Sequence, residues 1–499
     1  MWRCMSGRAI VGLCFLIAVA LGNRAFTRTQ AADSPYRVRI AYVVPSDRQP
    51  QANYREKAAV LVGRIRDFYA DQMECNGFGR MTFNVESAAD GRPEVHLIHS
   101  PMTAAVFADT GHARYVTGKY WEHAFQSVID AGFRPDDQGE IWLCFVEAQE
   151  QVADGSVKND STQGNGRFGS GFALCTGLEL ALGGDPDLIH DHRNYANLTI
   201  PAIGPHPLQW HKSFPDYQGD DVSSLAADYI SATAHELGHC FLLQHTYIND
   251  ATKCGNLMGN GFRGWRGYYM PSRFPDEDTR LSRPSALMLR LCPFFRRPAE
   301  LAVYSDPPKI TIQTTPGAMG LTHGVFHLSF TASEPKGPGI AMATLENGRD
   351  RDGVGVVTWL EFDGKARTVS GDFETTSMSA DQEDTWRVTV LDASGNESIQ
   401  TIKMTSPRTG IGPSPFISVG HTRVRTGVAV KFKGSVKRPW KYTYLWDFGD
   451  GTKGSGALVD HIFAKPGVYH VHLSAIDAGG RIGQIAITMC AKDTDPPDR

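Results

Sequence analysis

Two histidines and a glutamate have the spacing of a hydrolytic metal site. His235 and His239 are four residues apart in segment 234–245, AHELGHCFLLQH. Residues four apart lie on one face of a helix, so both imidazoles can reach one ion. Glu236 lies beside that face, where its carboxylate can accept a proton from an activated water molecule without binding the metal. We therefore expect a zinc (Zn2+) site with Glu236 as general base.

The residues before this motif predict the helix that must carry it. Oxygens of Asp220, Asp221 and Ser223 can cap a helix that begins near residue 222. An apolar stripe follows at helical spacing: Ala226, Ile230, Ala234, Leu237 and Phe241. The alternative, a helix with two solvated histidines, does not explain a glutamate next to the apolar run 241–243.

Two further features carry a resemblance to a known family. His245 follows His239 by six residues, and residues 254–259 read CGNLMG. This pattern resembles the metzincin zinc peptidases, over residues 225–270, and the second segment is similar to the methionine turn beneath their zinc. The resemblance implies three zinc ligands, His235, His239 and His245, with Met258 as the apolar floor. A core methionine is the alternative role for Met258.

The sequence departs from the metzincin pattern at one position. That pattern has glycine three residues after the second ligand, where this chain has Leu242. If the helix continued, His245 would lie about 240° around from His239 and would face away. A left-handed backbone at Leu242 would turn the chain back at a cost of about 1–2 kcal/mol. We expect His245 as third ligand, with Asp250 and Glu277 as alternatives.

Peptide hydrolysis is the reaction that the resemblance implies. Zinc would polarise the carbonyl group and activate water, while Glu236 moves the proton to the leaving amine. One of Tyr247, Tyr268 and Tyr269 could assist. One alternative is an extracellular adhesion or binding protein whose zinc site is structural or inactive. Another is a latent enzyme in which the Cys240 thiolate fills the open zinc position, although on a helix Cys240 would point about 100° away from His239.

Residues 33–300 are expected to form one α+β domain around this helix, of metzincin-like fold. Strands are predicted at 36–44, 81–86, 94–98 and 140–147, with helices at 54–73 and 119–130. Residues 152–220 are rich in Gly, Asp, Asn and Pro and are predicted to be loop-like. Four histidines in this stretch could line a cleft: His190, His192, His206 and His211.

Two all-β domains are expected after the peptidase domain. Residues 306–406 have short alternating segments between turns, typical of an immunoglobulin-like sandwich, with strands predicted at 310–314, 325–331, 356–362, 386–391 and 401–404. Residues 413–492 contain WDFGDG at 446–451 and HIFAKPGVYHV at 461–471. These motifs resemble a PKD domain, an immunoglobulin-like sandwich found in many secreted proteins. The two domains suggest attachment to a polymer, a cell surface or a large protein substrate.

The ends and composition of the chain indicate an exported protein. Arg3 and Arg8 precede an apolar run at 9–22, so residues 1–32 are predicted to be a signal peptide, with an uncleaved anchor as alternative. The mature chain is expected to be extracellular or periplasmic and to have no transmembrane segment. It would hold seven cysteines, an odd number, whose pairing the sequence leaves open. A net charge of −4 and the absence of a basic stripe exclude nucleic acid as an expected partner.

Overall fold

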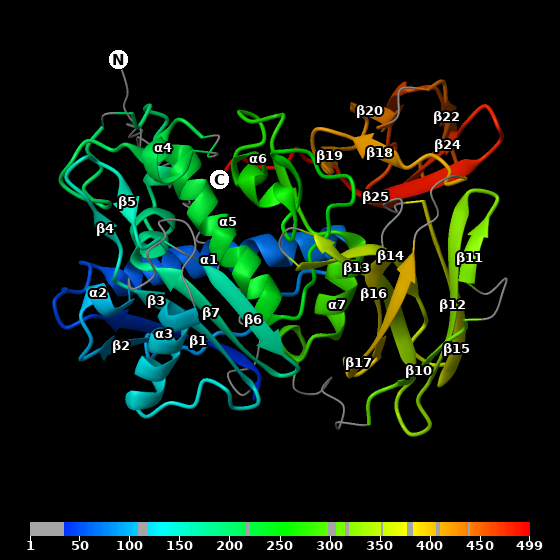
Figure 1. Ribbon diagram of the computed structural model, residues 1–499. Helices are drawn as coiled ribbons and strands as arrows, with labels where there is room; N and C mark the ends of the chain where they lie inside the picture. The colour runs from blue at the N-terminus through cyan, green and yellow to red at the C-terminus, as the bar shows by residue number, and fades with distance from the viewer. Residues whose placement is uncertain are drawn as a thin grey trace, which may run out of the picture.

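A computed structural model describes most of the chain (Figure 1). The described residues are 34–107, 118–160, 162–196, 198–215, 217, 219–297, 306–314, 319–350, 353–376, 383–405, 410–437 and 440–499. The predicted signal peptide at 1–32 lies outside them. Within these ranges no helix is both long and apolar enough to cross a membrane.

The first part of the fold is a five-stranded sheet with helices on both faces. Its order is β2 (Val95–His99), β1 (Arg37–Val44), β3 (Glu140–Val146), β7 (Ser170–Thr176) and β6 (Gln163–Arg167). The first four strands are parallel, and β6 is an antiparallel edge strand. Alternate residues of β1 enter two cores, one shared with α1 (Tyr54–Cys75) and α5 (Val222–Cys240), the other with α3 (Gly118–Asp130). The helix α5 is thereby fixed against one face of the sheet.

Shorter elements connect these and follow α5. Between β2 and α5 the chain forms α2 (Ala104–Phe107), β4 (Glu150–Gln151), β5 (Val157–Lys158), η1 (Glu179–Gly183), η2 (Leu188–His190) and α4 (Trp210–Ser213). After α5 come β8 (Cys254–Asn256), η3 (Asn260–Gly264), α6 (Trp265–Tyr269), β9 (Asp278–Arg280), α7 (Arg283–Leu291) and η4 (Pro293–Phe295).

Two of the predictions for this part are wrong. The stretch 152–220 contains β6 and β7, not only loops. Every residue of β7 is buried, so its sequence SGFALCT lacks the alternation that reveals a half-buried strand, and β6 has glycine at two of five positions. The strand predicted at 81–86 is reduced to one isolated bridge between Val38 and Val85. The other predicted strands and helices of this part are present.

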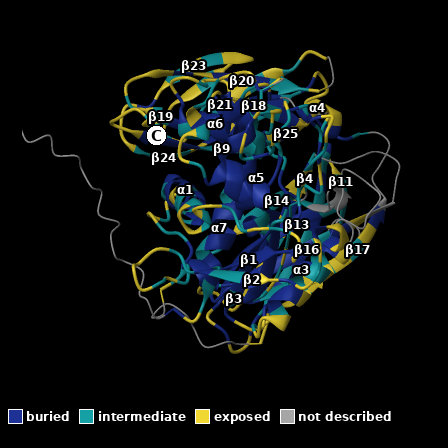
Figure 2. Ribbon diagram, turned by 90° about the vertical axis from the view of Figure 1, so that its left-hand side faces the viewer, coloured by how far each residue is buried: buried dark blue, intermediate teal, exposed yellow. Residues whose placement is uncertain are grey.

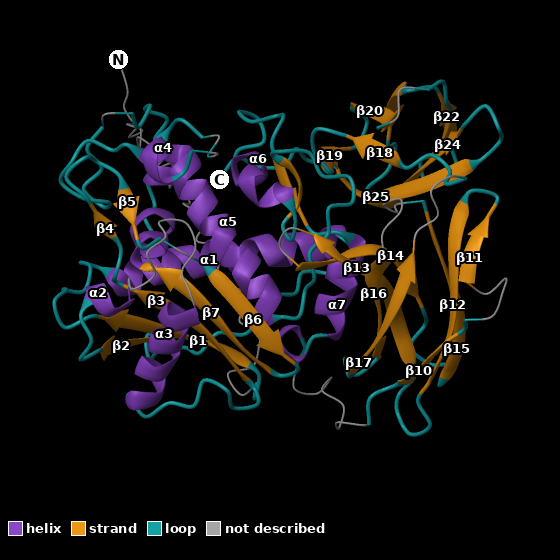
Figure 3. Ribbon diagram, in the orientation of Figure 1, coloured by secondary structure: helices purple, strands orange, loops and turns teal. Residues whose placement is uncertain are grey.

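The second part spans residues 309–405, and its described residues form strands and no helix (Figure 3). One sheet joins β10 (Lys309–Ile312), β12 (Val325–Ser333), β11 (Met319–Thr322) and β15 (Thr368–Thr375). The other has the order β14 (Gly353–Glu361), β13 (Ile340–Asp350), β16 (Glu383–Asp392) and β17 (Glu397–Thr405). Both sheets contribute to one core, including Phe330, Phe373 and Trp386, so this part is a β-sandwich. The five predicted strands are present, and β11, β13 and β15 were not predicted.

The third part, residues 415–492, is a smaller sandwich. One sheet has the order β18 (Pro415–Ser418), β20 (Ala429–Val436), β23 (Leu458–Ile462). The other has β19 (Arg423–Arg425), β25 (Ile482–Lys492), β24 (Gly467–Ile476), β21 (Thr443–Asp447) and β22 (Lys453–Ser455). Trp446 and Phe448 are buried between them with nearly parallel rings. Asp447 and Asp450 accept backbone hydrogen bonds in the turn that follows.

The third part is bonded back to the first. A disulfide joins Cys75, the last residue of α1, to Cys490 of β25. Lys492 and Arg499 form ion pairs with Glu74 and Asp71 of α1. The third part is therefore held against α1, and the residues of α5 are mostly buried (Figure 2).

Candidate metal centre

The helix α5 carries the predicted motif and begins where its capping residues indicate. Asp221 is the N-cap, and its side chain accepts a hydrogen bond of 2.8 Å from the backbone nitrogen of Ser224. In the last turns of the helix, the Tyr69 hydroxyl of α1 donates to the carbonyl oxygen of Ala234 at 2.8 Å. The helix is thus held at both ends, and its last two turns carry His235, Glu236 and His239.

The three predicted histidines converge on one point. The Nε2 atoms of His235 and His239 are 3.1 Å apart. The ring of His245 lies 5.3 Å from that of His235 and 4.7 Å from that of His239, measured between centroids. One nitrogen from each ring lies within 4.8 Å of the other two. His245 therefore lies beside the other two imidazoles, which its sequence separation of six residues from His239 did not by itself guarantee.

Hydrogen bonds at the opposite ring nitrogens orient two of these imidazoles. Nδ1 of His235 donates to the carbonyl oxygen of Leu257 at 2.7 Å, and Nδ1 of His239 donates to that of Leu243 at 3.0 Å. With Nδ1 protonated, each Nε2 keeps its lone pair for a metal ion. Burial, the neighbouring histidines and Arg263 hold the pKa of His235 well below its ordinary value, so the ring is neutral.

Leu242 turns the chain back after the helix. Its φ is +69°, in the left-handed region predicted for it. The backbone N–H of Leu242 donates to the carbonyl oxygen of His239 at 3.0 Å, and that of Leu243 donates to the carbonyl oxygen of Gly238 at 3.0 Å. These two hydrogen bonds form a Schellman motif. The helix ends at Cys240, and His245 is returned to the face that it would have left. Leu242 therefore ends the helix with a left-handed backbone that is strained for a residue with a side chain.

The second part of the fold supports His245 from behind. Residues His245 and Gly355 form an isolated parallel bridge, in which Val356 of β14 donates its N–H to the carbonyl oxygen of His245 at 2.8 Å. Nothing local in the sequence near His245 signals this contact, because its partner lies 110 residues away. The sequence interpretation missed it for that reason.

The edge strand β6 lies against the helix at Glu236. A Cβ atom on Gly164 would lie 2.1 Å from the carbonyl oxygen of Glu236, and one on Gly166 would lie 2.7 Å from that of His239. Only glycine allows so close an approach. Glu236 itself is half-buried on the last turns of α5, next to His235. The packing of these glycines against α5 was not predicted, because residues 152–220 were expected to be loop-like.

Met258 packs against the helix α5 at Gly238. It is fully buried, and its sulfur would lie 2.5 Å from a Cβ placed on Gly238. Its turn is held by Asp250, whose carboxylate accepts hydrogen bonds from the backbone nitrogens of Asn256 and Asn260, each at 2.8 Å. Asp250 is therefore engaged in the turn, and this alternative to His245 is not at the site.

The structure places the other candidate residues elsewhere. Glu277 bonds to Arg266 at 2.6 Å, and the Cys240 thiol donates to Asn165 at 3.6 Å, so neither faces the histidines. Among the tyrosines, Tyr247 has its ring 6.0 Å from that of His245, whereas Tyr268 is buried against Asp71 and Tyr269 stacks near Arg64. The four histidines of 152–220 are not part of the group of three metal-binding candidates. Each contacts another residue instead: His190 lies near Tyr269, His192 near Asp221, His206 near Gln151 and His211 near Tyr195.

The arrangement suits a zinc ion. Three neutral imidazole nitrogens are a common catalytic zinc donor set. Two nitrogens bound to one tetrahedral zinc are about 3.3 Å apart for Zn–N bonds of about 2.05 Å, and His235 and His239 are close to that spacing before any ion is added. Within the described residues only one other group could hold a metal, and it is largely exposed: His327, Asp372 and Glu374.

Comparisons with known proteins identify one domain and one fold. The PKD domain family matches residues 413–489, so this part of the chain is a PKD domain. Catalytically inactive OgpA from Akkermansia muciniphila, solved in complex with an O-glycopeptide substrate (glycodrosocin), has a similar structure, with a TM-score of 0.50 and 14% identity. The similarity covers 74% of this chain and 93% of OgpA. The PKD1 domain of the Vibrio cholerae metalloprotease PrtV aligns with 24% identity over 16% of this chain and 99% of that domain, with a TM-score of 0.15. No curated protein sequence matches the chain.

Proposed function

We propose that the protein is a zinc-dependent endopeptidase with Glu236 as general base. The observation that carries the proposal is the convergence of three imidazoles beside this glutamate. A purely structural metal site has no need of a base. The metzincin-like site, with Leu242 in place of glycine, is part of the proposal.

The chain supplies the ligands, the base and the floor of this site. Zinc, when held by the three imidazoles, would polarise the substrate carbonyl group and lower the pKa of a water molecule. Glu236 would take a proton from the attacking water and later deliver it to the leaving amine as the peptide C–N bond breaks. The carbonyl groups of Leu257 and Leu243 keep two ligands in the required tautomer. Tyr247 is the one candidate tyrosine beside the ligands.

Peptides, including O-glycopeptides, are the proposed substrates. The support is the fold shared with OgpA, whose structure holds an O-glycopeptide substrate. The half-buried position of Glu236 at the sheet edge fits a substrate that enters along β6.

Export to the extracellular or periplasmic space completes the proposal, with residues 1–32 as the signal peptide. The disulfide between Cys75 and Cys490 supports it, because such bonds persist in oxidising compartments. We divide the mature chain at 33–300, 306–406 and 413–492, with an immunoglobulin-like second domain. Attachment to a polymer or cell surface through the β domains is part of this proposal.

The test combines metal analysis with digestion. The purified chain is expected to hold one zinc per molecule and to hydrolyse casein, gelatin or glycodrosocin. A chelator should abolish hydrolysis and added zinc should restore it, while His245→Ala should lower the zinc content. Zinc that remains bound with no hydrolysis of any of these substrates would favour the binding-protein alternative.

A further inference from the structure

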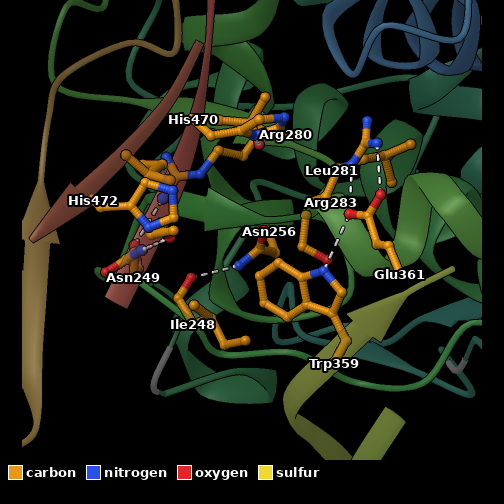
Figure 4. A pocket seen from close by; sticks show the side chains of 14 residues that line it. Ile248, Asn249, Asn256, Arg280, Leu281, Arg283, Trp359, Glu361, His470 and His472 are labelled. Atoms are coloured by element: carbon orange, nitrogen blue, oxygen red, sulfur yellow. Dashed lines mark hydrogen bonds and ion pairs between the residues drawn. The ribbon is translucent and has the colours of Figure 1, made fainter. Parts of the chain in front are cut away.

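A cavity of about 310 Å³ lies where all three parts of the fold meet. Its walls come from the loop after His245 and the start of α7, from β14, and from β24 and β25 of the PKD domain. Figure 4 shows Trp359 and Glu361 of β14 on one side, and His470 and His472 of β24 on another. The volume is at the lower end of the range for small-molecule sites.

This cavity is separate from the metal centre. Gly355 pairs with His245, and Trp359 lies four residues further along the same strand. At about 3.3 Å per residue, the two positions on β14 are about 13 Å apart. The histidines His235, His239 and His245 are therefore not among the residues that line the cavity.

The charges of the cavity walls are balanced in pairs. Arg283 donates from Nε and Nη2 to the two oxygens of Glu361, each at 2.8 Å. Burial would raise the pKa of Glu361, but the hydrogen bonds and positive charge of Arg283 lower this pKa, so Glu361 stays ionised. Arg280 donates to the carbonyl oxygen of Asn249 at 2.7 Å and lies 3.6 Å from Asp278. A free anion or cation thus finds no unbalanced partner here, which favours a neutral ligand.

The walls also combine an aromatic ring with polar atoms of fixed direction. The indole nitrogen of Trp359 donates to Glu361 at 3.3 Å, which holds the ring in place. Nδ1 of His470 lies 3.2 Å from the Thr488 hydroxyl, and His472 is exposed on the same strand. Carboxylate oxygens accept hydrogen bonds, guanidinium nitrogens donate them, and neutral imidazoles do both. A sugar ring matches this set, because its C–H face packs on an aromatic ring and its hydroxyls both donate and accept.

We propose that this cavity binds a neutral sugar unit, with Trp359 as the stacking platform and Glu361, Arg283 and the two histidines as hydroxyl partners. The site would be formed only when the PKD domain is docked, since β24 and β25 supply one wall. Sugar binding goes beyond the proposed peptidase function and does not depend on it. It would hold a glycosylated polymer or substrate against the molecule.

The test is titration of the full chain with free galactose, N-acetylgalactosamine and N-acetylglucosamine, followed by tryptophan fluorescence and calorimetry. At least one should bind with a Kd on the order of 1 mM, as expected for a ligand of this size. Trp359→Leu should weaken that binding about tenfold or more. Trp440→Leu is the matched control, because Trp440 is 57% exposed and does not line the cavity.

A second variant guards against misfolding. His472→Ala alters an exposed side chain and should weaken the same sugar several-fold without changing thermal stability. Binding that is unchanged in both Trp359→Leu and His472→Ala would overturn the proposal, as would the absence of binding by all three sugars. Binding of N-acetylneuraminic acid alone would overturn the neutral character of the site. Because the probes are free sugars, these outcomes are independent of peptide hydrolysis.

Discussion

Gly238 lets the helix α5 lie directly on Met258, and this contact predicts an unusual effect of alanine. In a helix interior, Gly→Ala stabilises by about 1 kcal/mol. At this position the new Cβ would lie 2.5 Å from the Met258 sulfur and 3.2 Å from its methyl carbon. Overpacking of this kind costs about 1–3 kcal/mol. Gly238→Ala should therefore leave stability unchanged or lower it by up to about 2 kcal/mol.

Two comparisons isolate the cause. Gly63 of α1 has nothing within 4 Å of the corresponding Cβ position, so Gly63→Ala should stabilise by about 1 kcal/mol. When Met258→Ala removes the obstructing side chain, Gly238→Ala should also become stabilising by about 1 kcal/mol. The effect of one substitution thus changes with the presence of the methionine, which a double-mutant cycle measures directly.

Thermal unfolding with a chelator present is the assay, so that metal binding does not contribute. Each kcal/mol corresponds to a shift in Tm of about 2–4 °C for a part of this size. Gly238→Ala that raises Tm as much as Gly63→Ala, or that has the same effect with and without Met258, would refute the packing of the methionine beneath the helix.

Three further predictions concern the turn, the disulfide and pH. Leu242→Val should destabilise by about 1–2 kcal/mol relative to Leu242→Asn, because asparagine tolerates a left-handed backbone and a β-branched residue does not; equal melting temperatures would contradict this. Cys490→Ser should cost about 2–5 kcal/mol under oxidising conditions, and reductant should lower the Tm of the wild type but not of the variant. Burial would raise the pKa of Glu86, but hydrogen bonds from His96 and Arg39 lower this pKa from 4.5 to about 2. This depressed value stabilises the fold above about pH 4.5 and the gain is lost as pH falls to about 2, so Glu86→Gln should cost about 1–3 kcal/mol at pH 7 and nothing near pH 2 in urea titrations.

The local part of the site could be predicted from the sequence. His235, Glu236 and His239 lie on one helix, so their relative positions follow from helix geometry alone. The left-handed turn at Leu242 could be expected because only that backbone returns His245, and the structure has it. Met258 was expected only from the resemblance of residues 254–259 to a methionine turn, and its side chain is fully buried.

The remainder depends on contacts between distant residues. The strand β7 is buried on both faces, so hydrophobic alternation could not reveal it. The glycines of β6 are needed only because α5 packs so closely against them, and this contact is not visible in the local sequence. The support of His245 by Val356 and the disulfide to the PKD domain join segments more than 100 residues apart. Periodicity and local motifs carry no information on such pairs.

Glu236 is proposed to move the proton in a zinc-dependent hydrolysis. The most direct measurement compares the wild type and Glu236→Gln for zinc content and peptide hydrolysis in the same preparation. We expect one zinc per chain in both proteins and a rate of hydrolysis at least about 100-fold lower in the variant. Full hydrolytic activity in Glu236→Gln with zinc bound would contradict it.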